Sequence, residues 1–189
     1  AGDAWGGVVK DSIYSPRIGA NVEVTEGLAL YGNYGQGFHS NDARGVTAPT
    51  DAAPGLVKGN FRELGVRFER GRLVVTGNYW WSRIASELIY VGDSGAVEPS
   101  GAGRRHGYEL TAWWKLSDWL TVDAVWTAAK SRYADLPAGA NYIPGALSNS
   151  GELGLATRFD RFNASLRVRH LGPHALNEDY SAKGSATTL

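Results

Sequence analysis

Polar side chains suited to ligand binding gather in one short stretch of the sequence. His39, Asn41, Asp42 and Arg44 follow one another closely. Imidazole nitrogens and carboxylate oxygens both bind metals, so His39 and Asp42 could donate N and O ligands to a metal chelate. Asn and Asp also form turn hydrogen bonds with nearby backbone, and Arg44 could pair locally. Two interpretations stay open: a ligand-binding patch in a loop, or an ordinary turn.

The same stretch contains the residue types of a hydrolytic triad, because Ser40 stands between His39 and Asn41. A triad requires side chains that converge in space, which adjacency in sequence does not provide. The sequence contains no GxSxG element either. We therefore predict that the protein is not an enzyme and has no catalytic residues. Cysteine is absent, which excludes disulfides and cysteine-ligated metals, and we expect no metal ion and no cofactor.

Basic residues form a second candidate group. Arg104, Arg105 and His106 precede a predicted strand that begins at Gly107. Their charge could attract an anionic chelate or the phosphates of lipopolysaccharide through charge-assisted hydrogen bonds. The alternative is a solvated loop end, or a pair between this group and Glu109.

Alternation of apolar and polar residues predicts the strands that position these groups. From Arg17 to Thr25, for example, Ile18 and Val22 fall on one face and Asn21 on the other. Eight such segments are legible, and a ninth begins at Lys183. The others lie near residues 28–38, 63–69, 73–82, 108–116, 120–127, 153–158 and 162–169.

The connections between these segments are short and long in turn. Tight turns are predicted at Glu26-Gly27, Arg70-Gly71, Ser117-Asp118 and Asp160-Arg161. Between them lie long loops rich in Gly, Pro, Asn and Asp, at Phe38–Val57, Val91–Gly103, Tyr133–Ser148 and Gly172–Lys183. An antiparallel meander with turns at one end and long loops at the other is the plan of an outer-membrane barrel.

A soluble sandwich would show the same alternation, with the apolar face buried in a core. Three features favour the membrane: charges of both signs along the predicted inner faces, Tyr and Trp near strand ends, and long loops on one side. No apolar run reaches the ~18 residues of a membrane helix, but barrel strands need only ~9 to 11 residues. We therefore predict an all-β fold, an antiparallel transmembrane β-barrel segment of about eight meandering strands with short periplasmic turns and long extracellular loops.

In such a barrel, Arg167 and Arg169 would be lumen-facing. We expect them to form ion pairs with acidic neighbours such as Glu152, or with a plug inside the barrel. His170 and His174 flank Gly172-Pro173 and are interpreted as loop residues. The expected partners are outer-membrane lipid and lipopolysaccharide. Net charge is zero, with 19 Lys+Arg and 19 Asp+Glu, so no nucleic-acid partner is expected.

Several longer motifs resemble those of one known family. The string GQGFHSNDARG, after LALYGNYG, resembles a strand-to-loop junction in the C-terminal part of the barrel of TonB-dependent outer-membrane receptors. FRELGVRFERGRLVVTGNYWWSRIASELIYVGDSG, RRHGYELTAWWKLSDWLTVDAVW and GPHALNEDYSAKGSATTL are also similar to segments of that family. The resemblance extends from about Ser15 to Leu189.

The resemblance implies a large plugged barrel of the 22-stranded class. It also implies active uptake of a scarce ligand, such as an iron-siderophore or another metal chelate, powered through TonB acting on the plug. We expect residues 1–189 to be a partial outer-membrane β-barrel domain, without a plug and without the final strands. The alternative is a self-contained small outer-membrane barrel that acts as a passive pore or as a structural or adhesion protein. Pairing of the strand near Arg17 with the strand near Leu166 would distinguish the alternative.

Overall fold

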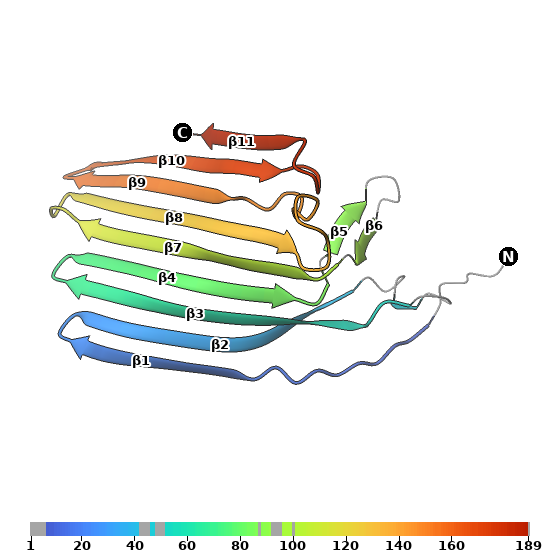
Figure 1. The fold of residues 1–189 in the computed structure, drawn as a ribbon. Helices are drawn as coiled ribbons and strands as arrows, with labels where there is room; N and C mark the ends of the chain where they lie inside the picture. The colour runs from blue at the N-terminus through green and yellow to red at the C-terminus, as the bar shows by residue number, and fades with distance from the viewer. Residues whose placement is uncertain are drawn as a thin grey trace.

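The computed structural model describes residues 7–41, 46–47, 52–86, 88–91, 96–99 and 101–188, with the backbone alone for 88–91 and 96–99. One antiparallel sheet of nine strands dominates, in the order β1-β2-β3-β4-β7-β8-β9-β10-β11 (Figure 1). Its strands are β1 (Arg17–Thr25), β2 (Leu28–Ser40), β3 (Leu56–Arg70), β4 (Leu73–Ile84), β7 (Gly103–Lys115), β8 (Leu120–Tyr133), β9 (Asn149–Phe159), β10 (Phe162–Ala175) and β11 (Lys183–Thr188). The predicted all-β meander is confirmed.

The short turns lie together at one end of the sheet and the long connections at the other (Figure 1). Gly27 and Gly71 have positive φ values of 75° and 59°, and Asp160 has a φ of 51°. These values explain why glycine stands at the first two turns, since other residues rarely adopt them. The turn predicted at Arg70-Gly71 falls one residue later, because Arg70 still pairs with Leu73.

Register places the predicted apolar residues on one face of the sheet. Val22 pairs with Leu30, and Leu30 pairs with Val66. We call the side with these residues the apolar face, and the opposite side, with Asn33, Glu63 and other polar residues, the polar face. Trp81 and Trp114 lie on the apolar face, whereas Trp80 and Trp113 lie on the polar face, so the tryptophans near the strand ends do not form a single girdle.

The sheet is a single layer without a hydrophobic core beneath it. Among the described residues, the buried apolar side chains are few and lie near the long-loop end, as Val57, Ala102, Tyr133, Ile143 and Ala175. Most large apolar residues of the strands are exposed, including Leu64 at 63% and Ile18 at 73%. An apolar face this large is stable only when something other than water covers it, and lipid covers such a face in a barrel. No helix in the described part of the chain is long and apolar enough to span a membrane.

The two edges of the sheet do not meet. In the described residues β1 pairs with β2, and β10 pairs with β9 and β11, so Arg17 and Leu166 lie on strands that are not paired. The ninth strand expected from Lys183 is present as β11. Two of the long loops are shorter than predicted, because β2 continues to Ser40 and β10 continues to Ala175. A separate hairpin of β5 (Leu88–Val91) and β6 (Ala96–Pro99) lies in the connection between β4 and β7, where we expected only a loop.

Candidate functional site

The acidic residues of the nine-stranded sheet all lie on its polar face. Strand alternation and the antiparallel register place them there together, although they come from five different strands. They are Glu23, Glu63, Glu69, Glu109, Asp123 and Glu152. This face can therefore bind cations and form ion pairs, which the apolar face cannot do with its own residues.

Ion pairs connect three neighbouring strands on the polar face. Arg167 donates from Nη1 to Glu152 Oε1, and its Nη2 lies 3.1 Å from Asp123 Oδ1. Arg169 Nη2 lies 2.7 Å from the other oxygen of Glu152. Glu152, which the sequence analysis named as a partner, thus contacts both arginines. The network fixes the relative positions of β8, β9 and β10 on this face.

Glycines make room for long side chains that cross an intervening strand. A Cβ atom at Gly154 on β9 would lie 2.4 Å from Asp123 Oδ1 and 2.8 Å from Arg167 Nη2. Gly65 has the same role on β3, because a Cβ there would lie 2.2 Å from the Tyr31 ring. The sequence analysis did not identify this role. In a sequence, this role could be recognised from a glycine at a polar-face position of a strand, when the neighbouring strands carry long polar or aromatic side chains.

Tyr31 crosses Gly65 and reaches β4. Its hydroxyl accepts a hydrogen bond from Asn78 Nδ2 at 3.4 Å. Nearby, Asn33 Nδ2 donates to Glu63 Oε1 at 2.6 Å. The polar face is therefore covered by side chains that link strands across the sheet, and this arrangement stiffens it.

The structure describes two members of the predicted ligand-binding patch. Asn41 is buried, and its Nδ2 donates to the carbonyl oxygen of Pro54 at 2.8 Å, which ties together the two ends of the β2–β3 loop. His39 Nε2 is buried without a hydrogen-bond partner among the described residues. Asp42 and Arg44 lie outside the described residues. Asn41 thus bonds to the backbone across the loop and not within a local turn, while Nε2 of the His39 ring is buried at the long-loop end.

The strand geometry explains why Ser40 and His39 do not form a catalytic pair. Both residues lie in β2, where successive side chains point to opposite faces of the sheet. Their hydroxyl and imidazole groups are therefore directed apart. Adjacency within a strand prevents the convergence that a hydrolytic triad needs.

The basic group at residues 104–106 is also divided between the two faces. It lies inside β7, not before it. Arg104 and His106 pair with Arg83 and Trp81 on the apolar face, while Arg105 pairs with Ser82 on the polar face. The predicted cluster of three is therefore wrong as a unit, because alternation within a strand separates its members.

Two long loops at the long-loop end are joined by stacked side chains. The ring of Tyr142, in the β8–β9 loop, stacks on the ring of Tyr180, in the β10–β11 loop, with centroids 4.8 Å apart. Arg132 lies over the Tyr142 ring at 3.8 Å. Backbone bonds support the contact, since Tyr142 N donates to Glu178 O at 3.1 Å. The two loops therefore form one structured unit above the sheet.

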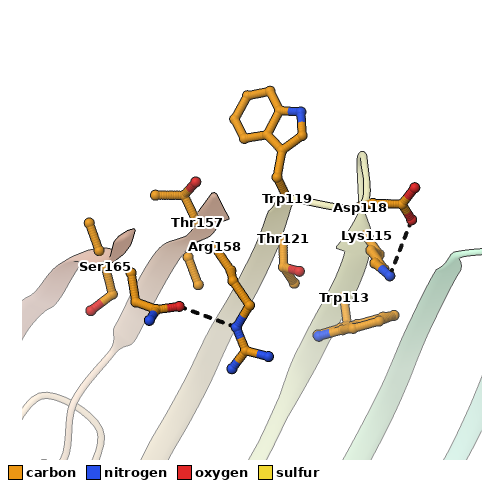
Figure 2. A pocket seen from close by; sticks show the side chains of 11 residues that line it. Trp113, Lys115, Asp118, Trp119, Thr121, Thr157, Arg158 and Ser165 are labelled. Atoms are coloured by element: carbon orange, nitrogen blue, oxygen red, sulfur yellow. Dashed lines mark hydrogen bonds and ion pairs between the residues drawn. The ribbon is translucent and has the colours of Figure 1, made fainter. Parts of the chain in front are cut away.

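An open hollow of about 620 Å³ lies at the short-turn end, where β7 to β10 approach their turns (Figure 2). Arg158 Nε donates to Asn163 Oδ1 at 3.2 Å, and Lys115 Nζ lies 3.4 Å from Asp118 Oδ1. Other polar-face side chains line it, among them Trp113, Thr121 and Ser165. The sequence analysis did not predict the hollow.

The histidines near the end of β10 do not converge on a common point. His170 Nδ1 lies 2.9 Å from Thr187 Oγ1, and His174 Nδ1 lies 3.4 Å from Gly172 O. Both residues lie within β10, which continues past Gly172-Pro173 with an irregular register, so their assignment to a loop is wrong. The described part of the chain contains no group of three or more His, Cys, Asp or Glu residues able to hold a metal ion.

Comparison with known proteins adds to this geometry. Residues 2–188 match the family model described as TonB dependent receptor-like, β-barrel. A comparison with curated proteins finds no significant match.

Solved structures share the fold. The chain is similar to the ferric yersiniabactin uptake receptor from Yersinia pestis, with a TM-score of 0.72 and 19% identity over 91% of this chain and 28% of that one. The ferric preacinetobactin receptor from Acinetobacter baumannii has a TM-score of 0.70 and 14% identity, over 92% of this chain and 28% of that one. The ferripyoverdine receptor of Pseudomonas aeruginosa has a TM-score of 0.69 and 15% identity, over 94% of this chain and 26% of that one. The chain therefore spans less than a third of the length of these structures.

Proposed function

Because the chain belongs to the family of TonB-dependent receptor β-barrels, we propose that it forms part of the wall of an outer-membrane transporter. Proteins of this family reside in the bacterial outer membrane. The transporter would take up a scarce ligand, such as a siderophore or another metal chelate. The observation that carries the proposal is the single-layer meander, whose two faces differ in chemistry and whose long loops share one end.

The orientation follows from these two faces. Lipid would cover the apolar face, and the polar face would line the lumen, so Arg167 and Arg169 would be lumen-facing. The short turns would be periplasmic and the long loops extracellular. Residues 1–189 would then be a partial barrel domain of a longer receptor, whose plug engages TonB. The unpaired outer edges of β1 and β11 support this, because lipid does not tolerate open sheet edges.

The ligand would enter at the long-loop end. His39 lies near the end of β2, and Asn41 follows the strand at this end. Together with Asp42 and Arg44, which come next in the sequence, they would contact the ligand directly or hold the loop that does. The names of the similar structures support an iron chelate as the ligand, since those proteins are receptors for ferric yersiniabactin, ferric preacinetobactin and ferripyoverdine.

Uptake of radiolabelled iron by cells that carry the full-length receptor tests the proposal. Catecholate, hydroxamate and citrate complexes of iron are supplied separately to cells with and without the receptor gene, and to cells without TonB. We expect uptake of at least one complex that requires both genes. Uptake that persists without TonB would instead indicate a passive pore, and no receptor-dependent uptake of any complex would exclude iron-chelate transport.

A variant locates the ligand contact. His39→Gln in the full-length receptor removes the imidazole at the long-loop end, and we expect a higher KM for uptake. His170→Gln is the matched control, because that histidine lies on the apolar face beside Thr187. Equal KM values for the two variants and the wild type would remove His39 from the ligand site.

A further inference from the structure

We propose that the apolar face binds the phosphate groups of lipopolysaccharide at its long-loop end, an inference that rests on the outer-membrane location in the proposed function. The binding groups are cations on four strands, five of them exposed and Arg132 half-buried, which we call the basic belt. Most of them are arginines, whose guanidinium groups bind phosphate in a bidentate manner. The belt consists of Lys58, Arg62, Arg83, Arg104, Lys130 and Arg132.

The register brings like charges directly opposite one another. Arg83 on β4 pairs with Arg104 on β7, and Arg104 pairs with Arg132 on β8. Neighbouring strands are only about 4.8 Å apart, and like charges in such positions repel each other and destabilise a sheet. An anion between the guanidinium groups removes this cost. The column of three arginines is therefore arranged for an anionic partner.

A second row of the belt lies one step closer to the middle of the sheet. Arg62 pairs with Trp81, which pairs with His106, which in turn pairs with Lys130. The two rows together place positive charge across β3, β4, β7 and β8. Several phosphate groups could thus be bound at once.

The belt has no acidic partners in the described part of the chain. All acidic residues of the nine strands lie on the opposite face, and none of the belt cations forms an ion pair with a described carboxylate. Arg132 has a cation–π contact with Tyr142, and Arg62 lies 5.6 Å from the centre of the Tyr34 ring. By contrast, Arg67, Arg167 and Arg169 on the polar face all contact carboxylates. Among the described residues, the basic belt is therefore positive and has no carboxylate partner.

The height of the belt in the membrane matches that of lipid headgroups. The stretch from Leu73 to Trp81 on β4 rises about 26 Å along the strand, or about 20 Å along the membrane normal at the usual tilt. Tyr79, Trp81 and Tyr108 form a contact cluster at the top of this stretch, with ring centroids 4.2 and 4.5 Å apart. Such aromatic residues lie at the membrane–water interface. Arg83 and Arg104 come directly beyond them, at the level of the headgroups.

A hollow of about 380 Å³ lies within the belt. It is lined by Asn60, Arg62, Trp81, Ser82 and Arg83. Two guanidinium groups suit a phosphate, while the Asn amide and the indole ring suit a sugar beside it. A phosphorylated sugar is the headgroup chemistry of lipopolysaccharide, which occupies the outer leaflet. At the short-turn end, Arg70 is the only cation that the described strands place on the apolar face. The positive charge of this face is therefore concentrated at the level of the outer leaflet.

A binding experiment with the full-length receptor in lipid nanodiscs tests the proposal. The probes are lipopolysaccharide, the same lipid after removal of its phosphates, and inorganic phosphate. The belt variant is Arg83→Gln with Arg104→Gln. The matched control is Arg70→Gln with Arg161→Gln, which removes the same charge at the short-turn end. Heat-modifiable migration in detergent confirms that each variant is folded, and Arg83→Lys with Arg104→Lys retains the charge.

We expect the belt variant to bind lipopolysaccharide at least about tenfold more weakly, since a hydrogen bond to a charged group contributes about that factor or more. The control should bind like the wild type, and the lysine variant should fall between them. Unchanged binding by the belt variant, equal binding of the dephosphorylated lipid, or a site that takes inorganic phosphate alone would overturn the proposal. Iron uptake per folded receptor is measured in parallel. Its absence in the wild type would overturn the transport function while leaving lipid binding to be judged separately.

Discussion

Arg167 on β10 reaches across β9 to Asp123 on β8, with 3.1 Å between Nη2 and Oδ1. The two residues belong to strands that do not pair with each other. Their contact is possible because Gly154, on the strand between them, has no side chain to occupy the space. A single glycine thus couples three strands through charge as well as through backbone hydrogen bonds.

Replacing Gly154 with alanine should separate Arg167 from Asp123 at little cost to stability. The atoms that the new methyl would meet are the mobile ends of those two side chains, and alanine is favoured over glycine in a strand by about 0.5–1 kcal/mol. Gly107→Ala is the comparison, because its methyl would lie 2.3 Å from the carbonyl oxygen of Ala128. That clash with backbone should cost about 1–3 kcal/mol. Urea unfolding of the full-length receptor, followed by tryptophan fluorescence, measures both, and equal losses would contradict the expectation.

Glu152→Gln should lower stability more than Asp123→Asn does. Glu152 contacts two arginines, whereas Asp123 contacts one. The difference should shrink as salt is added, because these side chains are partly exposed and ions screen their attraction. The transition midpoints in urea at low and high ionic strength provide the measurement. Glu23→Gln on the edge strand β1 serves as the control, and an equally large effect there would show that charge alone matters.

Tyr31→Ala should destabilise the sheet, while Tyr31→Phe should be nearly neutral. The ring covers the backbone of Gly65, and alanine would leave that glycine uncovered. The phenylalanine variant loses only the long 3.4 Å hydrogen bond with Asn78, which contributes at most about 0.5–1.5 kcal/mol. Unfolding midpoints of the two variants decide the matter. A larger loss for Tyr31→Phe would mean that the hydroxyl, not the ring, holds β2, β3 and β4 together.

Acid should loosen the β10–β11 loop. The backbone amide of Ser181, together with its hydroxyl, donates hydrogen bonds to Asp179 and holds the pKa of that carboxyl below its usual value. A lowered pKa stabilises the loop above the ordinary Asp pKa of about 3.9, and this stabilisation is lost as the pH falls below that value. Hydrogen exchange at the Ser181 amide, corrected for intrinsic rates, should therefore rise in acid. Asp179→Asn should flatten the pH dependence, and an unchanged profile would remove Asp179 as its cause.

Much of the fold could be predicted because apolar and polar residues alternate along a barrel strand, according to the face of the sheet on which each residue lies. The alternation from Arg17 to Thr25, and its repeats, indicated both the strands and their two faces. Glycine at positions 27 and 71 indicated two of the turns, since the backbone there requires positive φ. The β5–β6 hairpin was missed because its strands are only four residues each, too short for alternation to stand out.

The candidate site was harder to predict, because its contacts depend on register between strands. The pairing of Arg167 with Asp123 crosses a whole strand, and the sequence does not show which glycine lies between them. Arg104 and Arg105 are adjacent in sequence and were therefore grouped together, but alternation within the strand places them on opposite faces of the sheet. Conversely, the arginine column at residues 83, 104 and 132 appears only when three strands are aligned.

In this sheet, each described strand pairs with its neighbours in sequence, and the one interruption in the described part of the chain is the β5–β6 hairpin between β4 and β7. Such an order allows the sheet to grow by one hairpin at a time, because each new pair of strands needs only the most recent edge as its template. No step closes a loop longer than the connection between two consecutive strands of the sheet, so the loop-closure entropy of each step stays small. The sequential topology therefore gives a direct route for insertion into the bilayer, in which backbone groups are left unpaired only at the two edges of the growing sheet.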